Sequence, residues 1–342
     1  MKKVLATILA LVMALSVTTM AWADDVAKIG GTGYATLQEA VDAATNGQTT
    51  IVLQSNVVLT ASLNVAAGKT VTLDLNSCKI TADMNGPHMI CNAGNLTITD
   101  SSENKTGEIA KIGAETNFGY VIENHGTMTL DRCKISSTSV KSSAIENGWY
   151  TASANTAGTS CTMTIQNAEV VSVNAVGGLY TVKNDDYGVM VINGGVFTNG
   201  VAGAGAVLNW NDLTINGGTF TGASAVRTLK SGSSDFETGK SQIKNGTFNG
   251  GIDTLDGYKT GITIAVTGGT FSTDVTEYLA EGKILQKNGD TYTAVTNSGI
   301  TSGTYTAKPT VPDGYKVVEN TDGTFTVEKV GGYYYYQPTT DT

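Results

Sequence analysis

One short motif recurs along most of the chain and constrains its fold more than any other feature. It is an apolar-Thr-apolar segment, a polar turn that often contains Gly, and one large apolar residue, as in Leu213-Thr-Ile-Asn-Gly-Gly-Thr-Phe220. The closing apolar residues stand at positions 80, 109, 135, 170, 197, 220, 248 and 271, so the steps are 29, 26, 35, 27, 23, 28 and 23 residues. A constant minimum step with loop-sized additions is typical of a solenoid with insertions.

Each repeat contains only strand and turn patterns, without a helical period between them. This excludes leucine-rich and helical repeats, and a propeller blade would need a unit of ~40 residues. We therefore predict an all-β, right-handed parallel β-helix of about nine coils, counted from Ile51-Val-Leu53. The right hand is expected because parallel crossover connections nearly always have it.

A second motif, apolar-x-Asn, precedes the first motif in several repeats. Its Asn residues are Asn92, Asn124, Asn147, Asn184 and Asn209. We interpret them as one corner of successive coils, where Asn tolerates a left-handed backbone and stacked amides bond to one another. A structural role is favoured over a catalytic one for all five.

Both ends of the β-helix carry patterns expected of caps. Residues 36–44 predict a helix with a capping box of Thr36 and Glu39 and an apolar face of Leu37, Ala40, Val41 and Ala44. Residues 276–280 and a hairpin over 284–295 predict the other cap, within a β-helix domain of residues 24–296. A small hairpin module over 297–330, turning at Asp322-Gly323, and a disordered Tyr/Thr/Pro tail over 331–342 are expected to follow.

The N-terminus indicates export. Residues 1–23 contain Lys2 and Lys3, an apolar run and the small-x-small site Ala21-Trp22-Ala23, which together predict a signal peptide. These residues hold two of the 21 basic side chains and none of the 30 acidic ones, so the remaining side chains sum to 19 − 30 = −11. We expect a secreted or cell-surface protein, without membrane insertion of the mature chain and without nucleic acid as a partner.

The four cysteines, Cys78, Cys91, Cys133 and Cys161, would suffice for two disulfides in an exported protein. However, Cys78 and Cys133 each precede the large apolar residue by two positions, so both are expected to point inward and to lie two coils apart. That separation is too large for a bridge, and we predict buried free thiols. No Cys and His spacing indicates zinc, and no metal or cofactor is expected.

Beside these patterns, the opening of the chain resembles a known family. Ile29-Gly-Gly-Thr-Gly-Tyr-Ala-Thr-Leu-Gln-Glu-Ala-Val-Asp-Ala-Ala and Lys69-Thr-Val-Thr-Leu-Asp-Leu-Asn76 resemble the start of pectate-lyase-like right-handed β-helix proteins. The repeated Asn-Gly-Gly-Thr-Phe and the Tyr-rich tail look like surface proteins of Gram-positive gut bacteria. The resemblance implies an adhesin-like or carbohydrate-interacting protein. Many such proteins continue into a membrane or wall anchor, whereas this sequence ends at Thr342.

An enzyme of this fold needs a convergent set of charged groups. A polysaccharide lyase would require carboxylates that bind Ca²⁺ beside a basic residue, and a glycoside hydrolase would require two carboxylates facing one groove. The best candidates are Glu123 and Glu146 on adjacent coils, with Asp185 and Asp186 one coil further on. Equivalent positions would place the two Glu ~5 Å apart. The favoured interpretation is nevertheless that they are two solvated, outward-facing residues.

A binding function rests on the insertions at the Asn corner, over 148–162, 185–189 and 229–241. They carry Trp149, Tyr150, Tyr187, Trp210 and Phe236 to one edge of successive coils. Such rings can hold sugar rings by their apolar faces, or they can simply cover their own loops.

The sequence thus favours a non-catalytic β-helix that binds a glycan or a host surface. A polysaccharide lyase or hydrolase of the same fold, and a structural surface spacer, are the alternatives. A convergent carboxylate and basic set would favour the enzyme, an exposed aromatic row without it the binding protein, and a smooth rod the spacer.

Overall fold

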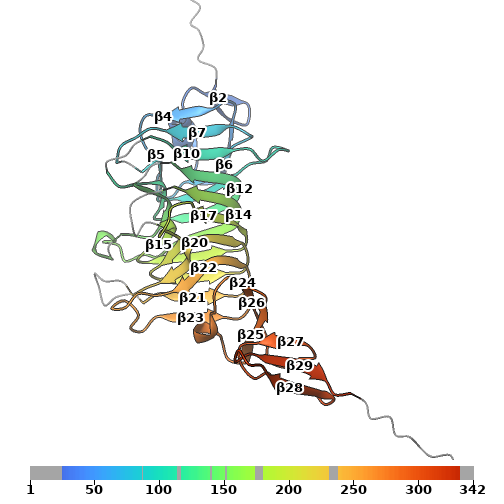
Figure 1. Cartoon of the computed structure of the whole chain (residues 1–342). Coiled ribbons are helices and arrows are strands. Elements are labelled where there is room, and N and C mark those ends of the chain that lie inside the picture. Colours follow the sequence, from blue (N-terminus) through green and yellow to red (C-terminus); the bar gives the residue numbers. More distant parts are fainter. Residues whose placement is uncertain are drawn as a thin grey trace, which may run out of the picture.

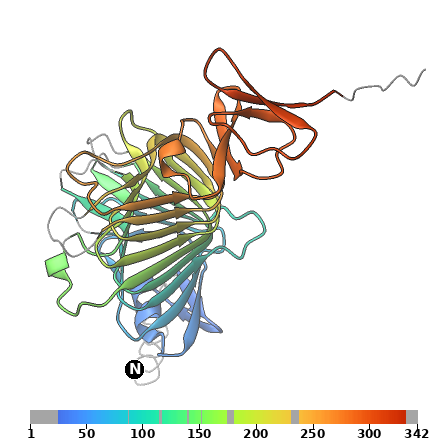
Figure 2. The same ribbon diagram turned by 90° about the horizontal axis from the view of Figure 1, so that it is seen from below.

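The protein is a rod of stacked coils with a small module at its C-terminal end (Figure 1). The computed structural model describes residues 25–86, 88–113, 117–138, 141–150, 152–173, 180–230 and 238–331. The predicted signal peptide and residues 332–342 of the predicted tail lie outside the described residues. Seen from below, the strands of successive coils overlie one another, and loops of the green part of the chain project from one side (Figure 2).

The rod has three sides, and on each side the parallel strands of successive coils form a sheet, here called a file. Each coil of the chain contributes one strand to each file in turn. The first file pairs β3 (Gln48–Leu53), β6 (Thr70–Asp74), β9 (Asn95–Thr99), β12 (Thr127–Ser137), β14 (Cys161–Ser172), β16 (Gly188–Ile192), β19 (Asp212–Ile215), β21 (Lys240–Ile243) and β23 (Thr263–Val266). The second pairs β4 (Val57–Leu59), β7 (Lys79–Ala82), β10 (Glu108–Lys111), the ends of β12 and β14, β17 (Gly195–Asn199), β20 (Thr219–Thr228), β22 (Thr247–Asp253) and β24 (Thr270–Phe271). The third pairs β5 (Leu63–Val65), β8 (Ile90–Asn92), β11 (Gly119–Asn124), β13 (Ser142–Asn147), β15 (Tyr180–Asn184), β18 (Gly205–Asn209) and the ends of β20 and β22.

This arrangement is the predicted parallel β-helix. The first file contains nine strands among the described residues, which agrees with the predicted number of coils. The large apolar residues that close the repeat point inward in one column. Phe197, Phe220, Phe248 and Phe271 are fully buried, and their rings stack with centroids 4.9, 5.0 and 4.9 Å apart. Identical residues in register thus form a continuous core, as the repeat requires.

The second Gly of the Gly-Gly turn is required by its backbone conformation. Gly195, Gly218 and Gly269 have φ values of 112°, 112° and 113°, in the region that residues with a Cβ rarely adopt. A Cβ on Gly195 would also lie 2.3 Å from the carbonyl oxygen of Ala168. Gly therefore recurs at this turn because its positive φ disfavours other residues and because the preceding coil lies close to it.

The Asn corner lies between the third and first files and holds a ladder of buried amides. Asn92 donates to Asn124 (2.7 Å), Asn124 to Asn147 (2.7 Å), Asn147 to Asn184 (2.8 Å) and Asn184 to Asn209 (2.8 Å), always from Nδ2 to Oδ1. The second amide hydrogen reaches a carbonyl of the following coil, as from Asn124 to Thr162 (3.0 Å). Each amide thus ties two neighbouring coils together and satisfies buried backbone acceptors.

The expected left-handed backbone at these Asn residues is wrong. None of the five is among the residues with positive φ. Instead, Oδ1 accepts the backbone N–H two residues on, as from Gly94 to Asn92 (3.1 Å) and from Asn211 to Asn209 (3.2 Å). The turn is therefore held by a side-chain hydrogen bond of the Asx type rather than by an unusual φ.

Both ends of the rod are covered where the sequence predicts caps. At the N-terminal end, α2 (Leu37–Ala43) buries Leu37, Ala40 and Val41, and Thr36 and Glu39 form both bonds of the capping box (3.2 and 3.0 Å). The antiparallel strands β1 (Ala27–Ile29) and β2 (Thr32–Tyr34) pair beside it, and β1 covers the edge of β3. The otherwise open first coil is thereby protected from edge-to-edge association.

At the other end, the 3₁₀ turn η2 (Thr276–Tyr278) precedes the antiparallel pair β25 (Lys283–Asn288) and β26 (Thr291–Thr296). The C-terminal module continues this pair with β27 (Gly303–Tyr305), β28 (Tyr315–Glu319) and β29 (Phe325–Lys329). Its small core of Ile284, Ile300, Tyr305 and Val327 includes a residue of β25. The module therefore packs directly on the cap hairpin.

The four cysteines are free. Cys133 is buried as expected, and burial raises the pKa of its thiol to about 12. Cys78 also packs against the core, but it is only partly buried rather than fully buried as expected. The two preceding residues, Asn76 (φ 46°) and Ser77 (φ 63°), both have left-handed backbones.

The ladder predicts a stability difference between two Asn residues. Replacing Asn209 by Ala should lower the free energy of unfolding by about 2–3 kcal/mol, because buried groups of Asn184 and Lys240 lose their partners. The control is Asn216→Ala, at an exposed position whose amide bonds Asn193 (2.7 Å), and it should change stability by less than about 0.5 kcal/mol. Denaturant unfolding measures both, and equal losses would contradict a structural role for the buried ladder.

Candidate functional site

The middle residue of the apolar-x-Asn motif forms a column on the outside of the third file. Cys91, Glu123, Glu146 and Lys183 are register partners on β8, β11, β13 and β15. The predicted equivalence of Glu123 and Glu146 is therefore correct, and their backbones lie one strand spacing, ~4.8 Å, apart. Titratable side chains thus stand next to one another on four successive coils.

Both histidines of the chain converge on Glu123. His88 Nε2 lies 3.3 Å from Glu123 Oε1, and His125 Nε2 lies 3.8 Å from the same oxygen. The side chains of Glu123, His88 and His125 are 18%, 31% and 29% exposed, so solvent reaches all three. An accessible carboxylate held between two imidazoles offers hydrogen-bond acceptors and donors and groups suited to proton transfer.

Aromatic rings fix the orientation of both imidazoles. The ring of His88 stacks on Tyr120 (centroids 5.0 Å, 10° between planes), and the ring of His125 stacks on Trp149 (4.4 Å, 3°). Tyr187 meets the edge of Trp149 (6.0 Å, 85°). The loop residue Trp149 is placed by its own backbone, because its N–H donates to the carbonyl of Asp186 (3.0 Å). The histidines are therefore held in position without a ligand.

A buried polar group lies directly beside this surface. Lys183 Nζ is 3.3 Å from Asp185 Oδ2 and 3.2 Å from the hydroxyl of Tyr120. The same ammonium lies 5.5 Å from the ring centroid of Tyr120 and 5.4 Å from that of Tyr150. Lys183 and Asp185 are both buried, which strengthens their mutual attraction relative to a surface pair. Tyr120 thus contacts both His88 and Lys183 and links the exposed and buried groups.

The expectation that Glu146 is a solvated surface residue is wrong, because it is only 1% exposed. Burial, and next the neighbouring Asp185 carboxyl, raise the pKa of Glu146 to about 10. Its Oε1 has no hydrogen-bond partner among the described residues. Glu146 is therefore a protonated acid at neutral pH, whereas Glu123 next to it faces solvent and two histidines. Asp185, Lys183 and Tyr120 all interact with Glu146, and the repeat pattern alone does not reveal its burial.

Burial also affects the pKa values of Lys183 and Cys91 in the same column. Burial alone would lower the pKa of Lys183, but the charge of Asp185 outweighs it and raises the pKa. Burial, and then the Glu123 carboxylate, raise the pKa of Cys91 to about 11. Lys183 is thus a permanent cation, and Cys91 is a protonated thiol with little nucleophilic character.

The predicted aromatic row divides into two groups. Trp149, Tyr150 and Tyr187 gather at the histidine site, and Tyr150 is 75% exposed. Trp210 instead packs on a separate cluster of Tyr180, Leu208 and Leu229 and meets the edge of Tyr258 (6.2 Å). Phe236 lies outside the described residues. Trp210 therefore covers its own loops, while the first group borders accessible polar side chains.

The other predicted residues take the following places. Asp185 pairs with Lys183, and the backbone of Asp186 forms a bridge with Trp149. The five Asn residues form the ladder and are buried.

Among the described residues, no group of three or more His, Cys, Asp or Glu side chains could hold a metal ion, and no helix is long and apolar enough to cross a bilayer.

Four residues of the site escape the sequence reasoning: His88, Tyr120, His125 and Lys183. Lys183 occupies the same motif position as Glu123 and Glu146, so the column could have been continued to it. His88 and His125 lie outside the strands that flank them, at the turns before β8 and after β11. Their convergence depends on how adjacent coils stack, for which the spacing in sequence gives no signal.

No protein-family model, no curated protein and no solved structure matches this chain. The resemblance to pectate-lyase-like surface proteins therefore stays a prediction, and the functional argument rests on the geometry of the site.

The environment of Glu146 predicts a pH dependence of stability. Because its pKa in the folded state lies above the unfolded value of 4.5, the stabilisation by the protonated carboxyl is complete below pH 4.5 and is lost as the pH rises towards about 10. Between pH 5 and 9 the free energy of unfolding should fall, by at most ~1.4 kcal/mol per pH unit from this group.

Glu146→Gln should flatten this dependence, because a neutral amide replaces the neutral acid. The exposed residue Glu169, which pairs with Lys134 (3.1 Å), provides the control variant Glu169→Gln, which should keep the wild-type slope. Chemical unfolding across the pH range measures all three proteins. An unchanged slope in Glu146→Gln would show that Glu146 is not the protonated group.

Proposed function

We propose that this chain is an exported β-helix protein that binds an extracellular glycan at the surface around Glu123. The observation that carries the proposal is the convergence of both histidines on Glu123, each held by a stacked aromatic ring. A preformed, partly exposed set of polar groups bordered by aromatic side chains is typical of ligand sites.

The chemistry of the surface suits sugars. Glu123 can accept hydrogen bonds from sugar hydroxyls, and the imidazole of His125 can donate or accept them. Both nitrogens of His88 are already engaged, Nδ1 by the backbone N–H of Tyr120 (3.2 Å) and Nε2 by Glu123 (3.3 Å). Tyr150 offers an exposed ring that can stack on the apolar face of a pyranose. The Lys183 ammonium lies 5.4 Å from the centroid of this ring. Export, which the sequence of residues 1–23 predicts, would bring the surface into contact with extracellular polysaccharides.

The adjacent carboxyl groups support glycoside hydrolysis as a second candidate. The backbones of these register partners lie one strand spacing, ~4.8 Å, apart, which allows the carboxyl separation of ~5–5.5 Å that retaining enzymes use. Their environments differ as an acid and a nucleophile require, since Glu146 is protonated and Glu123 is not buried. Binding is preferred because Glu146 is almost fully buried, so a substrate does not reach its carboxyl group.

The lyase and the spacer have less support. The described cations that a lyase would use are already paired: Lys183 with Asp185, and Arg227 with Asp253 through two hydrogen bonds (2.6 and 3.0 Å). A Ca²⁺ cluster of carboxylates is absent from the described residues. A structural spacer would not require the two histidines beside Glu123 or the aromatic rings that hold them.

One screen tests binding and cleavage together. The purified exported chain is applied to a glycan array and incubated with the same polysaccharides, with release of reducing ends as the measure of cleavage. Glu123→Gln and Tyr150→Ala should each weaken binding to a retained glycan about tenfold or more. The control Trp210→Ala removes an aromatic ring that packs on the separate cluster and should bind like wild type.

The outcomes separate the candidates. Cleavage that Glu146→Gln abolishes while binding persists would replace the binding function by hydrolysis. Retention of a glycan equally by wild type, Glu123→Gln and Tyr150→Ala would place binding elsewhere on the rod. Failure of the wild-type chain to retain or cleave any glycan would overturn both candidates.

A further inference from the structure

The C-terminal module repeats the strand pairing of the cap hairpin before it. In the cap, β26 lies between β24 and β25, with Phe271 opposite Tyr292, and β27 pairs with the other side of β25. In the module, β29 lies between β27 and β28, with Tyr305 opposite Phe325. Each unit thus consists of a short strand followed by a hairpin, and the short strand of the module closes the edge of the cap hairpin.

The corresponding edge of the module, on β28, is open. Among the described residues, β28 pairs with β29 alone. The ladder between them is fixed by backbone hydrogen bonds from Val330 to Gly314 (2.8 Å) and from Asn320 to Thr324 (2.8 Å). Bonding alternates along an antiparallel pair, so the N–H and C=O groups of Val317 point to the open edge. Unpaired backbone groups of this kind are a template for another strand.

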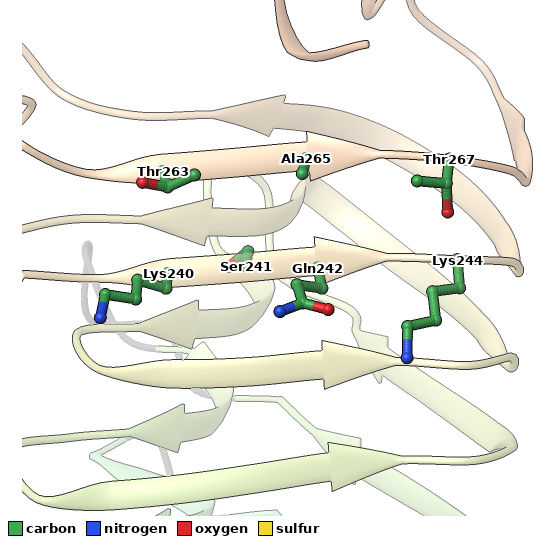
Figure 3. A pocket seen from close by; sticks show the side chains of 7 residues that line it. All are labelled: Lys240, Ser241, Gln242, Lys244, Thr263, Ala265 and Thr267. Carbon is green, nitrogen blue, oxygen red and sulfur yellow. The ribbon is translucent and has the colours of Figure 1, made fainter. Parts of the chain in front are cut away.

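In the rod, β21 offers no such edge. Figure 3 shows β21 with β23 beside it, where side chains such as Lys240, Gln242 and Thr263 line a hollow on the outer face. The backbone groups of β21 are used on both sides, because it pairs with β19 and with β23. β28 differs from such a stacked strand because its backbone groups are available to a partner.

The sequence beyond the described residues contains a third copy of the short strand. Gly303-Thr-Tyr-Thr-Ala-Lys-Pro-Thr310 and Gly332-Tyr-Tyr-Tyr-Tyr-Gln-Pro-Thr339 share Gly, Tyr, Pro and Thr at equivalent positions. In the module, Tyr305 is 3% exposed and Pro309 is buried. The third copy thus retains the two residues that the second copy buries.

The pairing of the second copy gives the register expected for the third. Thr304 of β27 lies opposite Lys287, the last residue but one of β25. Glu319 holds the equivalent place on β28, since Lys287 and Glu319 each lie opposite the aromatic residue of the second strand of their hairpin. The same register sets Tyr333 opposite Glu319.

The tail of the same chain is too short to reach that place. Val330 is held by its hydrogen bond to Gly314. From Val330, three residues lead to Tyr333, and they span at most ~11 Å. The place beyond Glu319 lies five residues further along the strand than Gly314 and two strand spacings across from Val330, roughly 19 Å away. The tail of a second copy has no such limit.

We propose that residues 332–339 of one copy add as a strand to the open edge of β28 in a second copy, so that chains associate end to end. Backbone hydrogen bonds hold the added strand, and Tyr334 packs on the module as Tyr305 packs on the residue of β25 in its core. The donor segment and the acceptor edge are different parts of the chain, so the contact is heterologous and open-ended. It involves none of the residues around Glu123 and is therefore independent of the proposed glycan site.

Sedimentation equilibrium of the full chain tests the proposal. Wild type should form oligomers that grow with concentration. Tyr334→Ser should weaken the association about tenfold or more, because the side chain equivalent to the buried Tyr305 is lost. The matched control is Tyr336→Ser, at the position equivalent to the exposed Ala307, and it should associate like wild type.

A complementation experiment separates the donor from the acceptor. Val317→Pro removes the N–H that points to the open edge, a place where an edge strand tolerates Pro, and leaves the tail intact. Neither Val317→Pro nor Tyr334→Ser should oligomerise alone. An equal mixture of the two should form a dimer, because one chain supplies the tail and the other supplies the edge.

Each measurement has a result that contradicts the proposal. A wild-type chain that stays monomeric up to about 1 mM would overturn it. Equal association of Tyr334→Ser and Tyr336→Ser would show that the tail is not the donor. A mixture of Val317→Pro and Tyr334→Ser that stays monomeric would show that β28 is not the acceptor.

Discussion

The ladder of buried Asn amides is the interaction on which the rest of the structure depends. Each amide joins a coil to the next one and holds the corner at the same height on both, from Asn92 to Asn209. Backbone pairing alone specifies that strands run side by side, but a slip of one residue would turn every side chain to the opposite face. A buried amide that needs its neighbour's oxygen penalises such a slip, because buried polar groups left without partners are costly. Fixed register then converts each motif position into a column of neighbouring side chains.

The candidate functional surface follows directly from this register. The residue before each ladder Asn stands outside the third file, so Glu123, Glu146 and Lys183 become neighbours although they are far apart in sequence. Insertions at the same corner then give these neighbours different environments. Glu146 is covered and stays protonated, whereas Glu123 is open to solvent between two histidines. One column thus contains a buried acid, a buried cation and an accessible carboxylate, which is the physical basis for placing glycan binding here.

The fold was predictable because strand direction, register and caps all depend on local patterns. The step between repeats predicts the coils, and Thr36 with Glu39 predicts the helix that covers them. Burial was not predictable where it depends on loops. The repeat indicates that Glu146 faces outward, but not that it is buried beside Asp185 and Lys183. Likewise, the motif does not show that Cys78 is only partly buried, and His88 and His125 converge on Glu123 only through the stacking of turns. Such features arise from contacts between coils that no single repeat encodes.

The most direct test of this account is side-chain amide hydrogen exchange, measured by NMR on the folded protein with ¹⁵N-labelled Asn. The Nδ2 hydrogens of Asn124, Asn147 and Asn184 should exchange only through opening of the coil stack, many orders of magnitude more slowly than in a free peptide. The exposed amides of Asn193 and Asn216, which also bond one another (2.7 Å), serve as the internal reference and should exchange rapidly. Rapid exchange of the three buried amides, at the rate of the exposed pair, would contradict the central role of the ladder.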